Sequence, residues 1–201
     1  NMLQGLRSGA GAIDLALGKG NLELAKEGWP ILARNLDRVY ALTFNMLAWS
    51  RTNVPEIALV QLDPIVQDAV DLIRGACERR SILIESNIEP DLPPIPIDGT
   101  AILQVLLNVL HNAVDASPLK TGKVKIDASI PESGEFLEII VTDNGSGIES
   151  GRREDVFVAF HTTKGQRGTG LGLAVAKKIV LEHQGTIEML DGEGGGTCCR
   201  I

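Results

Sequence analysis

The 201-residue sequence has few aromatic residues and no long apolar run. Phe, Trp and Tyr make up 3% of the chain, so a core must be built from Leu, Ile, Val and Ala, which the 44% hydrophobic content allows. No apolar run reaches the length of a membrane span and no signal peptide is visible, so we expect no membrane contact by this segment. The sequence starts without Met inside a helical pattern, and we expect a longer protein with room for a membrane anchor upstream.

Cysteine is also scarce. The three cysteines are Cys77, Cys198 and Cys199, and the last two are neighbours in a strand-like stretch. An odd number and this placement favour buried thiols in a reducing compartment over a disulfide or a metal site. We therefore expect a cytoplasmic location for this segment.

Basic residues are outnumbered, with 19 Lys and Arg against 26 Asp and Glu and a net charge of −7. This balance argues against a general nucleic-acid binder. Residues 1–55 carry six basic and four acidic side chains, a net charge of +2, which leaves −9 for the rest. An acidic domain that binds a polyanion needs backbone N–H groups and a divalent metal at the site.

Apolar residues recur at steps of three and four through the first 50 residues. This spacing predicts two helices, 1–17 and 22–50, separated by the break LGKGN. Asn21 is a suitable N-cap for the second helix, and Pro30 should kink that helix or shift its register. The two helices form the first expected domain, an antiparallel hairpin in residues 1–55.

Such a hairpin leaves an apolar stripe open when it stands alone. A second copy would cover the stripe as a four-helix bundle, and we favour this homodimer over an intramolecular support for the rest of the chain. Asn53-Val54-Pro55 ends the hairpin and is typical of a linker.

Strand and helix patterns alternate through the second expected domain, residues 56–201. Expected strands are 57–62, 82–88, 124–130, 135–143, 185–190 and 196–201, and expected helices are 63–79, 98–117 and 170–184. Asp63-Pro64 and Asp98 supply helix starts, and Gly185 supplies a helix end. Turns join the later strands, which favours a mixed sheet with helices on one face. The expected fold class is α+β: the helical hairpin followed by a two-layer α/β sandwich.

Two glycine-rich stretches flank the most informative part of the chain. A strand runs into Asp143, which opens the turn DNGSG, and the run GTGLG at 168–172 opens a helix. An acidic side chain on a tight turn can accept a hydrogen bond from a flat ring with donors. Glycines at a helix start let backbone N–H groups approach a phosphate. The order of residues fits neither a P-loop nor a dinucleotide fingerprint.

The helix 98–117 carries polar side chains on one face. Asn108 and Asn112 are one turn apart, Asp115 follows on the same side, and the opposite face is apolar. Carboxamide oxygens together with phosphate oxygens suit Mg²⁺, which takes few protein ligands. The alternative is an ordinary solvent-facing side of an amphipathic helix.

Five motifs follow one another along the chain: N-x-x-x-N-A on a helix, D-x-G-x-G after a strand, a Phe-containing loop, G-T-G-L-G-L and a terminal G-G-T. Together they resemble the ATP-binding domain of sensor histidine kinases, a member of the gyrase–histidine kinase ATPase superfamily with the Bergerat fold. The likeness spans about residues 57–201. The hairpin resembles the dimerisation and histidine-phosphotransfer helices that precede such domains.

The resemblance implies a role for each matching residue. Asn112 would coordinate Mg²⁺, Asn108 would support the metal and phosphates, and Asp143 would accept the amino group of adenine. Asn108 and Lys164 are the expected catalytic residues. The full set of expected ATP-binding residues is Asn108, Asn112, Asp115, Asp143, Gly145, Gly147, Lys164, Arg167, Gly168, Thr169, Gly170, Leu171, Gly172 and Thr197.

The resemblance also places Phe157 and Phe160 before a mobile lid, with ordinary core packing as an equal alternative for Phe157. Superfamily members that hydrolyse ATP carry Glu where Asn108 stands. Asn cannot act as a general base, so phosphoryl transfer to a protein side chain is favoured over hydrolysis.

The first 55 residues contain no histidine to accept a phosphoryl group. His111, His161 and His183 all lie later and suit structural or solvent roles, with His183 at a helix C-terminus where a cation is favoured. The start of the chain resembles the end of the family pattern H-x-x-K-N-x-L, which would put the acceptor four residues before Asn1. This segment is then expected to bind ATP without phosphorylating itself.

The leading hypothesis is an ATP-dependent protein-histidine kinase core, with an upstream sensor domain and a response-regulator receiver domain as partners. One alternative is a non-catalytic phosphotransfer or scaffold dimer with a vestigial nucleotide domain. Another is a serine kinase or ATP-gated clamp of the same superfamily.

Overall fold

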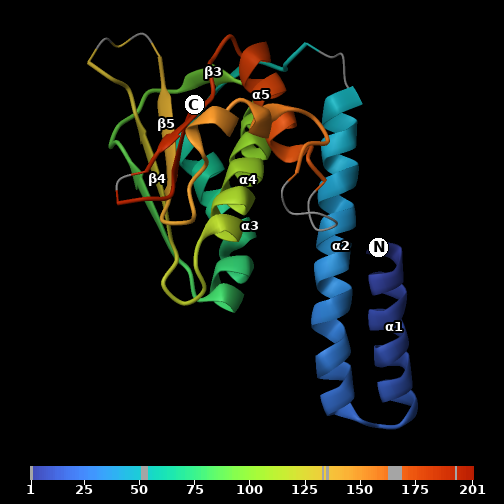
Figure 1. Cartoon of the computed structure of the whole chain (residues 1–201). Coiled ribbons are helices and arrows are strands. Elements are labelled where there is room, and N and C mark those ends of the chain that lie inside the picture. Colours follow the sequence, from blue (N-terminus) through green and yellow to red (C-terminus); the bar gives the residue numbers. More distant parts are fainter. Residues whose placement is uncertain (1, 51–53, 133, 135, 163–168, 193) are drawn as a thin grey trace. The chain divides into compact units, whose positions relative to one another are not determined.

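The computed structural model describes residues 2–50, 54–132, 134, 136–162, 169–192 and 194–201 (Figure 1). The chain divides into two compact units, which are described separately. The first is built on residues 1–51, and the second on residues 52–162 and 170–201.

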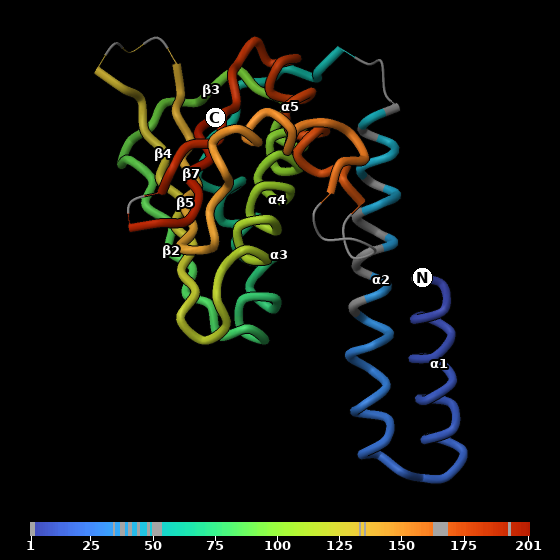
Figure 2. The backbone as a smooth tube through the Cα atoms, in the orientation of Figure 1, coloured from blue at the N-terminus to red at the C-terminus, as the bar shows by residue number. Residues whose placement is uncertain are grey.

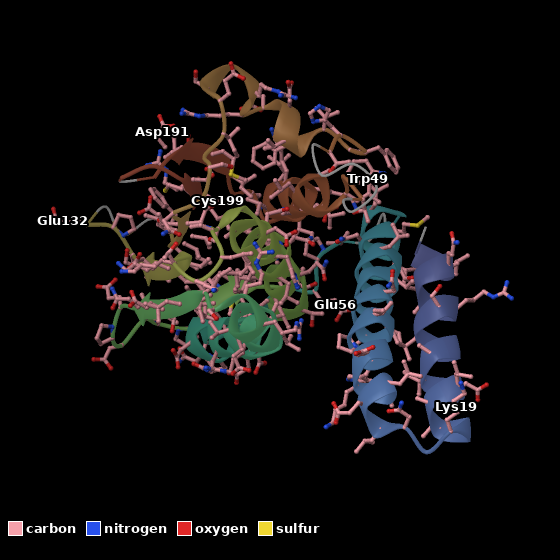
Figure 3. All side chains as sticks on the ribbon, turned by 60° about the horizontal axis from the view of Figure 1, so that its bottom comes forward. Lys19, Trp49, Glu56, Glu132, Asp191 and Cys199 are labelled. Atoms are coloured by element: carbon pink, nitrogen blue, oxygen red, sulfur yellow. The ribbon has the colours of Figure 1, made fainter. Side chains whose placement is uncertain are left out.

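The first unit is a helical hairpin of α1 (Met2–Gly18) and α2 (Leu22–Ser50), as Figure 1 shows. Lys19 lies in the connecting loop (Figure 3), and the amide of Leu24 donates to Asn21 Oδ1 at 3.2 Å, which confirms the predicted cap. The helices approach closely at Gly9, where an added Cβ would lie 2.7 Å from the Leu32 amide nitrogen.

α2 is continuous through Pro30, the residue at which a kink or a change of register was expected. Proline costs a helix one hydrogen bond and a local steric clash. The long contact between α1 and α2 compensates for this loss, because helical stability in proteins comes mostly from packing of an apolar face.

The second unit contains a five-stranded mixed sheet in the order β2-β4-β5-β7-β6. Its strands are β2 (Leu83–Ile88), β4 (Lys123–Ser129), β5 (Glu138–Asp143), β6 (Glu188–Asp191) and β7 (Thr197–Arg200). Figure 2 labels β2, β4, β5 and β7. β2 pairs with β4 in parallel, and the other neighbours are antiparallel. Figure 3 marks Glu132 at the tip of the turn between β4 and β5.

Three helices cover one face of this sheet (Figure 1): α3 (Leu62–Arg80), α4 (Gly99–Ala116) and α5 (Gly172–Glu182). Side chains alternate between buried and more exposed positions along β4 and β5, as expected for a sheet with one covered face. The layer between sheet and helices is fully buried at Leu106, Leu110, Ile126, Val141 and Val175. This arrangement confirms the predicted two-layer α/β sandwich with a mixed sheet.

The strand expected at 57–62 is shorter and lies outside the main sheet. β1 (Ala58–Val60) pairs antiparallel with β3 (Ile95–Ile97) as a separate two-stranded sheet. The predicted helix start at Asp63-Pro64 is also wrong, because α3 begins at Leu62 after Gln61, which makes no side-chain cap bond. Burial of Leu62, at 1% exposure, draws one more residue into the first turn.

The ends of the other helices test the remaining cap predictions. The Ala101 amide donates to Asp98 Oδ1 at 3.0 Å, which confirms Asp98 as the N-cap of α4. Gly185 is not the end of α5: the C-cap is His183, and Gln184 takes the left-handed conformation with φ 62°. Two short 3₁₀ turns, η1 (Ser150–Arg152) and η2 (Asp155–Phe157), lie between β5 and α5.

The three cysteines are free. Cys199 on β7, labelled in Figure 3, is 3% exposed, and burial with the neighbouring Cys198 raises the pKa of its thiol to about 12. Burial also raises the pKa of Cys77. These thiols stay protonated and pack as small apolar groups, as predicted.

Candidate functional site

Asp143 ends β5 and is 6% exposed. Its Oδ1 accepts hydrogen bonds from the amides of Gly145 at 2.8 Å and Thr197 at 3.3 Å. Burial raises the pKa of Asp143, and these amides together with the Thr197 side chain oppose part of that rise. Asp143 is therefore a buried acceptor held in a fixed orientation by two segments of chain.

The backbone around Asp143 is packed too tightly for side chains. A Cβ on Gly196, which has φ 84°, would lie 2.0 Å from the Asp143 carbonyl oxygen. A Cβ on Gly145 would lie 2.6 Å from the carbonyl oxygen of Ala116, the last residue of α4. Glycine at these positions is required by contacts within the protein itself, before any ligand is considered.

Asn144 anchors the same turn and was not singled out in the sequence. Its Oδ1 accepts from the Lys123 amide at 2.7 Å, and its Nδ2 donates to the Thr121 carbonyl at 3.0 Å. The tendency of Asn to bond nearby backbone groups in turns was the available signal. These bonds tie the Asp143 turn to the start of β4.

The polar residues of α4 form a gradient of burial. Asn108 is 8% exposed, Asn112 is half-buried and Asp115 is exposed. The Asn112 Nδ2 donates to the Asn108 carbonyl at 3.0 Å, which fixes the orientation of its amide. A solvent-facing surface does not describe Asn108, because this side chain lies inside the second unit.

The start of α5 lies directly against Asn108. A Cβ on Gly172 would be 3.3 Å from Asn108 Oδ1. Leu171 just before it is 2% exposed and anchors the helix start. The N-cap residue Leu171 has an apolar side chain that makes no cap hydrogen bond, and N–H groups at a helix start can in general bind an external anion.

Gly170 is held by the segment that precedes the glycine run. The Phe160 amide donates to the Gly170 carbonyl at 2.8 Å, and a Cβ on Gly170, which has φ 65°, would lie 2.5 Å from the Phe160 carbonyl carbon. Thr169 is half-buried, as is Gly147, whose φ is 70°. Lys164, Arg167 and Gly168 lie outside the described residues.

The two phenylalanines before the glycine run differ. Phe157 is 7% exposed, and the Lys177 Nζ lies 4.8 Å from its ring centroid, so this residue belongs to the core. Phe160 is 72% exposed and has φ 64°.

His183 has a structural role, as expected. Its Nε2 accepts a hydrogen bond from the Asp98 amide at 3.0 Å, so the ring is neutral. His161 is exposed, and exposed His111 contacts the Leu107 carbonyl through Nδ1 at 2.8 Å.

A cavity of about 520 Å³ opens elsewhere, at the N-terminal ends of α3 and α4. Among the described residues that line it none is basic, and Glu56, Asp68 and Asp98 are acidic, so it does not suit a triphosphate. The described residues contain no group of three or more His, Cys, Asp or Glu arranged to hold a metal ion. Within the same residues, no helix has the length and apolar character needed to cross a bilayer.

Residues 97–201 match the family of histidine kinase-, DNA gyrase B- and HSP90-like ATPases. This match spans more than half of the chain, and the chain belongs to this family. Several relatives and structural neighbours are named as histidine kinases, and the chain has a histidine kinase-type ATPase core.

One relative is the sensor histidine kinase ZraS of Escherichia coli strain K12, with 33% identity over 83% of this chain and 35% of ZraS. The crystal structure of full-length ShkA in complex with AMPPNP covers 98% of this chain and 42% of that one, with 22% identity and a TM-score of 0.70. The histidine kinase ThkA, solved in complex with the response regulator TrrA, covers 97% of this chain and 57% of its own, with 22% identity and a TM-score of 0.67. The chain spans about a third of the length of ZraS.

Proposed function

We propose that this chain is the Mg²⁺- and ATP-dependent core of a protein-histidine kinase in a two-component signalling system. The proposal rests on the contacts of α4 with both glycine segments of the candidate site. The last residue of α4, Ala116, packs on the Asp143 turn at Gly145, and Asn108 of the same helix packs on Gly172 at the start of α5. Eight residues of helix separate these contacts, about 12 Å, which is comparable to an extended nucleoside triphosphate.

At one end Asp143 would select adenine. Adenine presents an amino donor where guanine presents a carbonyl acceptor. A carboxylate fixed by the Gly145 and Thr197 amides favours the donor and repels the carbonyl. Asp143 accepts the amino group in its ionised form. Because burial raises its pKa, the carboxylate takes up a proton at a less acidic pH, so ATP should bind more weakly as the pH falls.

At the other end α4 and α5 would hold the phosphates and Mg²⁺. Asn112 supplies an oriented carboxamide, and Mg²⁺ would complete its coordination with phosphate oxygens and water, since the described residues hold no acidic metal cluster. The ion would offset charge on the transferring phosphoryl group. The first-turn amides of α5 would face the phosphates, and Lys164, Arg167 and Gly168 belong to the same proposal.

Phosphoryl transfer would need an imidazole from outside this segment. We place the acceptor four residues before Asn1 and the receiving Asp on a response regulator, as the likeness to ThkA suggests. Asn108 cannot deprotonate a water, so the bound triphosphate would be kept from hydrolysis until the imidazole attacks in line.

We further propose that residues 1–55 are the dimerisation and phosphotransfer domain and residues 56–201 the ATP-binding domain. The hairpin presents large apolar side chains that a second copy would cover. Among its described residues these are Leu3, Leu15, Leu17, Leu22, Trp29, Ile31, Leu36, Met46, Leu47 and Trp49.

Calorimetric titration with Mg-ATP tests the proposal. Asp143→Asn should lower the affinity at least 100-fold, because an amide oxygen is a weaker acceptor and its NH₂ group would face the adenine amino group. Asp91→Asn, the same change at an exposed residue with φ 63°, is the control and should bind like the wild type. A wild-type chain that binds no ATP would favour the scaffold alternative, and equal binding by Asp143→Asn would contradict the adenine role.

A second experiment tests the acceptor. A longer chain that includes the upstream residues should gain acid-labile phosphate from ATP, whereas this 201-residue segment should not. Labelling of the segment itself would show that the acceptor is misplaced.

A further inference from the structure

His183 contacts two backbone groups through its two ring nitrogens. Nδ1 lies 2.8 Å from the Ile179 carbonyl oxygen, and Nε2 lies 3.0 Å from the Asp98 amide nitrogen. A carbonyl oxygen only accepts, so Nδ1 carries the proton, and an amide only donates, so Nε2 is bare. The hydrogen bonds therefore assign one neutral tautomer, and a protonated ring would turn a second donor toward the Asp98 amide.

All polar groups of Asp98 form hydrogen bonds at the junction where the start of α4 meets the end of α5. Its amide donates to His183, and its carbonyl accepts from the Ile102 amide at 2.9 Å. Its two carboxylate oxygens accept from the amides of Ala101 at 3.0 Å and Glu56 at 3.2 Å. The start of α4 is thus tied to the end of α5 and to the segment that enters β1.

The junction lies at the far ends of α4 and α5 from the candidate phosphate site. α4 runs from Asp98 toward Asn108, and α5 runs from Gly172 toward His183, so the two helices are antiparallel with contacts at both ends. The two contacts are about 15 Å apart along either helix. The apolar contacts of α5 hold it on the sheet, and the two polar contacts with α4 set the position of its two ends relative to α4.

We propose that His183 is a positioning residue for the nucleotide. His183 does not touch the nucleotide itself. It fixes the direction of α5 and thereby the placement of the Gly172 amide toward the phosphates. The inference rests on the proposed function, since it assigns the phosphate end of that site. The apolar contacts of α5, which bury Val175, Ile179 and Val180, do not depend on the imidazole, so variants should still fold.

Two near-isosteric replacements separate positioning from packing. In His183→Gln the amide oxygen can accept from the Asp98 amide, whereas His183→Met fills similar space without a comparable acceptor. Mg-ATP and AMP affinities are measured calorimetrically well below each variant's melting temperature. We expect a loss of about fivefold to tenfold in ATP affinity for His183→Met, recovery to within about twofold for His183→Gln, and nearly unchanged AMP affinity in both.

Several results would overturn the inference. His183→Met could bind ATP like the wild type while melting earlier, which would reduce His183 to a purely structural role. It could also lose ATP and AMP affinity equally, which would separate His183 from the phosphate end. Failure of the wild type to bind ATP would overturn this inference together with the proposed function, whereas normal wild-type binding with either result above overturns this inference alone.

The wild-type protein offers a test that needs no variant. Linkage is reciprocal, so a bond that favours ATP binding must itself be strengthened by ATP. Hydrogen exchange at the Asp98 amide should slow several-fold on addition of Mg-ATP and much less with AMP. Exchange that ATP leaves unchanged, or nitrogen shifts that put the His183 proton on Nε2, would contradict the inference.

Discussion

The two ends of the candidate site are built in different ways. The Asp143 end is enclosed by backbone: Gly196 and Gly145 pack within a distance that admits no side chain, and two amides hold the carboxylate. At the Gly172 end the start of α5 meets α4 through a looser contact with the Asn108 side chain. The first end is therefore preorganised by its own turn, whereas the second depends on where α4 and α5 lie relative to each other. Substitution of the glycines that enclose the Asp143 end should lower the free energy of unfolding. Substitution at the Gly172 end should lower ligand affinity alone.

Gly196→Ala should have the largest effect, because it adds a side chain where the backbone is closely packed around Asp143. The new Cβ would meet the Asp143 carbonyl oxygen at 2.0 Å in a left-handed backbone conformation. We expect a loss of about 3 kcal/mol or more in the free energy of unfolding, measured in urea. Gly194→Ala is the control, with φ 78° and nothing within 4 Å, and should cost about 1 kcal/mol. Equal losses in the two variants would mean that backbone strain alone, and not close packing, distinguishes this end.

Asn112→Ala should affect the other end. It removes one carboxamide that is half-buried and bonded to the Asn108 carbonyl. Affinity for ATP in the presence of Mg²⁺ should fall about 10- to 30-fold, toward the value measured with EDTA, while the free energy of unfolding changes by less than about 1 kcal/mol. A variant that keeps the full Mg²⁺ dependence of ATP binding would remove Asn112 from the metal site.

The pH dependence of stability should be the smallest effect, and its difference between the wild type and Asp143→Asn reports on Asp143. Its folded pKa lies above the usual aspartate value of 3.8 mainly because of burial, so the folded state holds its proton more tightly than the unfolded state. This contribution to stability is full below that value and is lost as the pH rises through the folded pKa. Asp143→Asn should abolish it, and urea unfolding across this range compares the two proteins. A wild type whose stability rises through the window more steeply than that of Asp143→Asn would contradict the assigned direction.

Local patterns gave the parts of the structure that depend on neighbours in sequence. Asn21 and Asp98 cap the helices they precede, and two of the predicted strands form the paired strands β4 (Lys123–Ser129) and β5 (Glu138–Asp143). Asp143 ends its strand as predicted because the strand period and the glycine turn are both local signals.

Features that depend on distant segments were not predictable in this way. The pairing of β1 with β3 joins residues 58 and 97, and the Asp98–His183 bond joins residues 85 positions apart. The start of α3 moved from Asp63 to Leu62 because tertiary burial outweighed a favourable cap sequence. The contact of Asn108 with Gly172 likewise follows from helix packing, which neither motif specifies.

The central claim is that one nucleotide spans the distance from Asp143 to Asn112. Manganese in place of magnesium tests it directly, because the NMR line broadening that the ion causes falls steeply with distance. With a small fraction of the ATP carrying Mn²⁺, the account predicts the strongest broadening at Asn108, Asn112 and Gly172, and weaker broadening together with chemical-shift changes at the Gly145 and Thr197 amides. Broadening centred on other residues, or shifts at one end without the other, would contradict it.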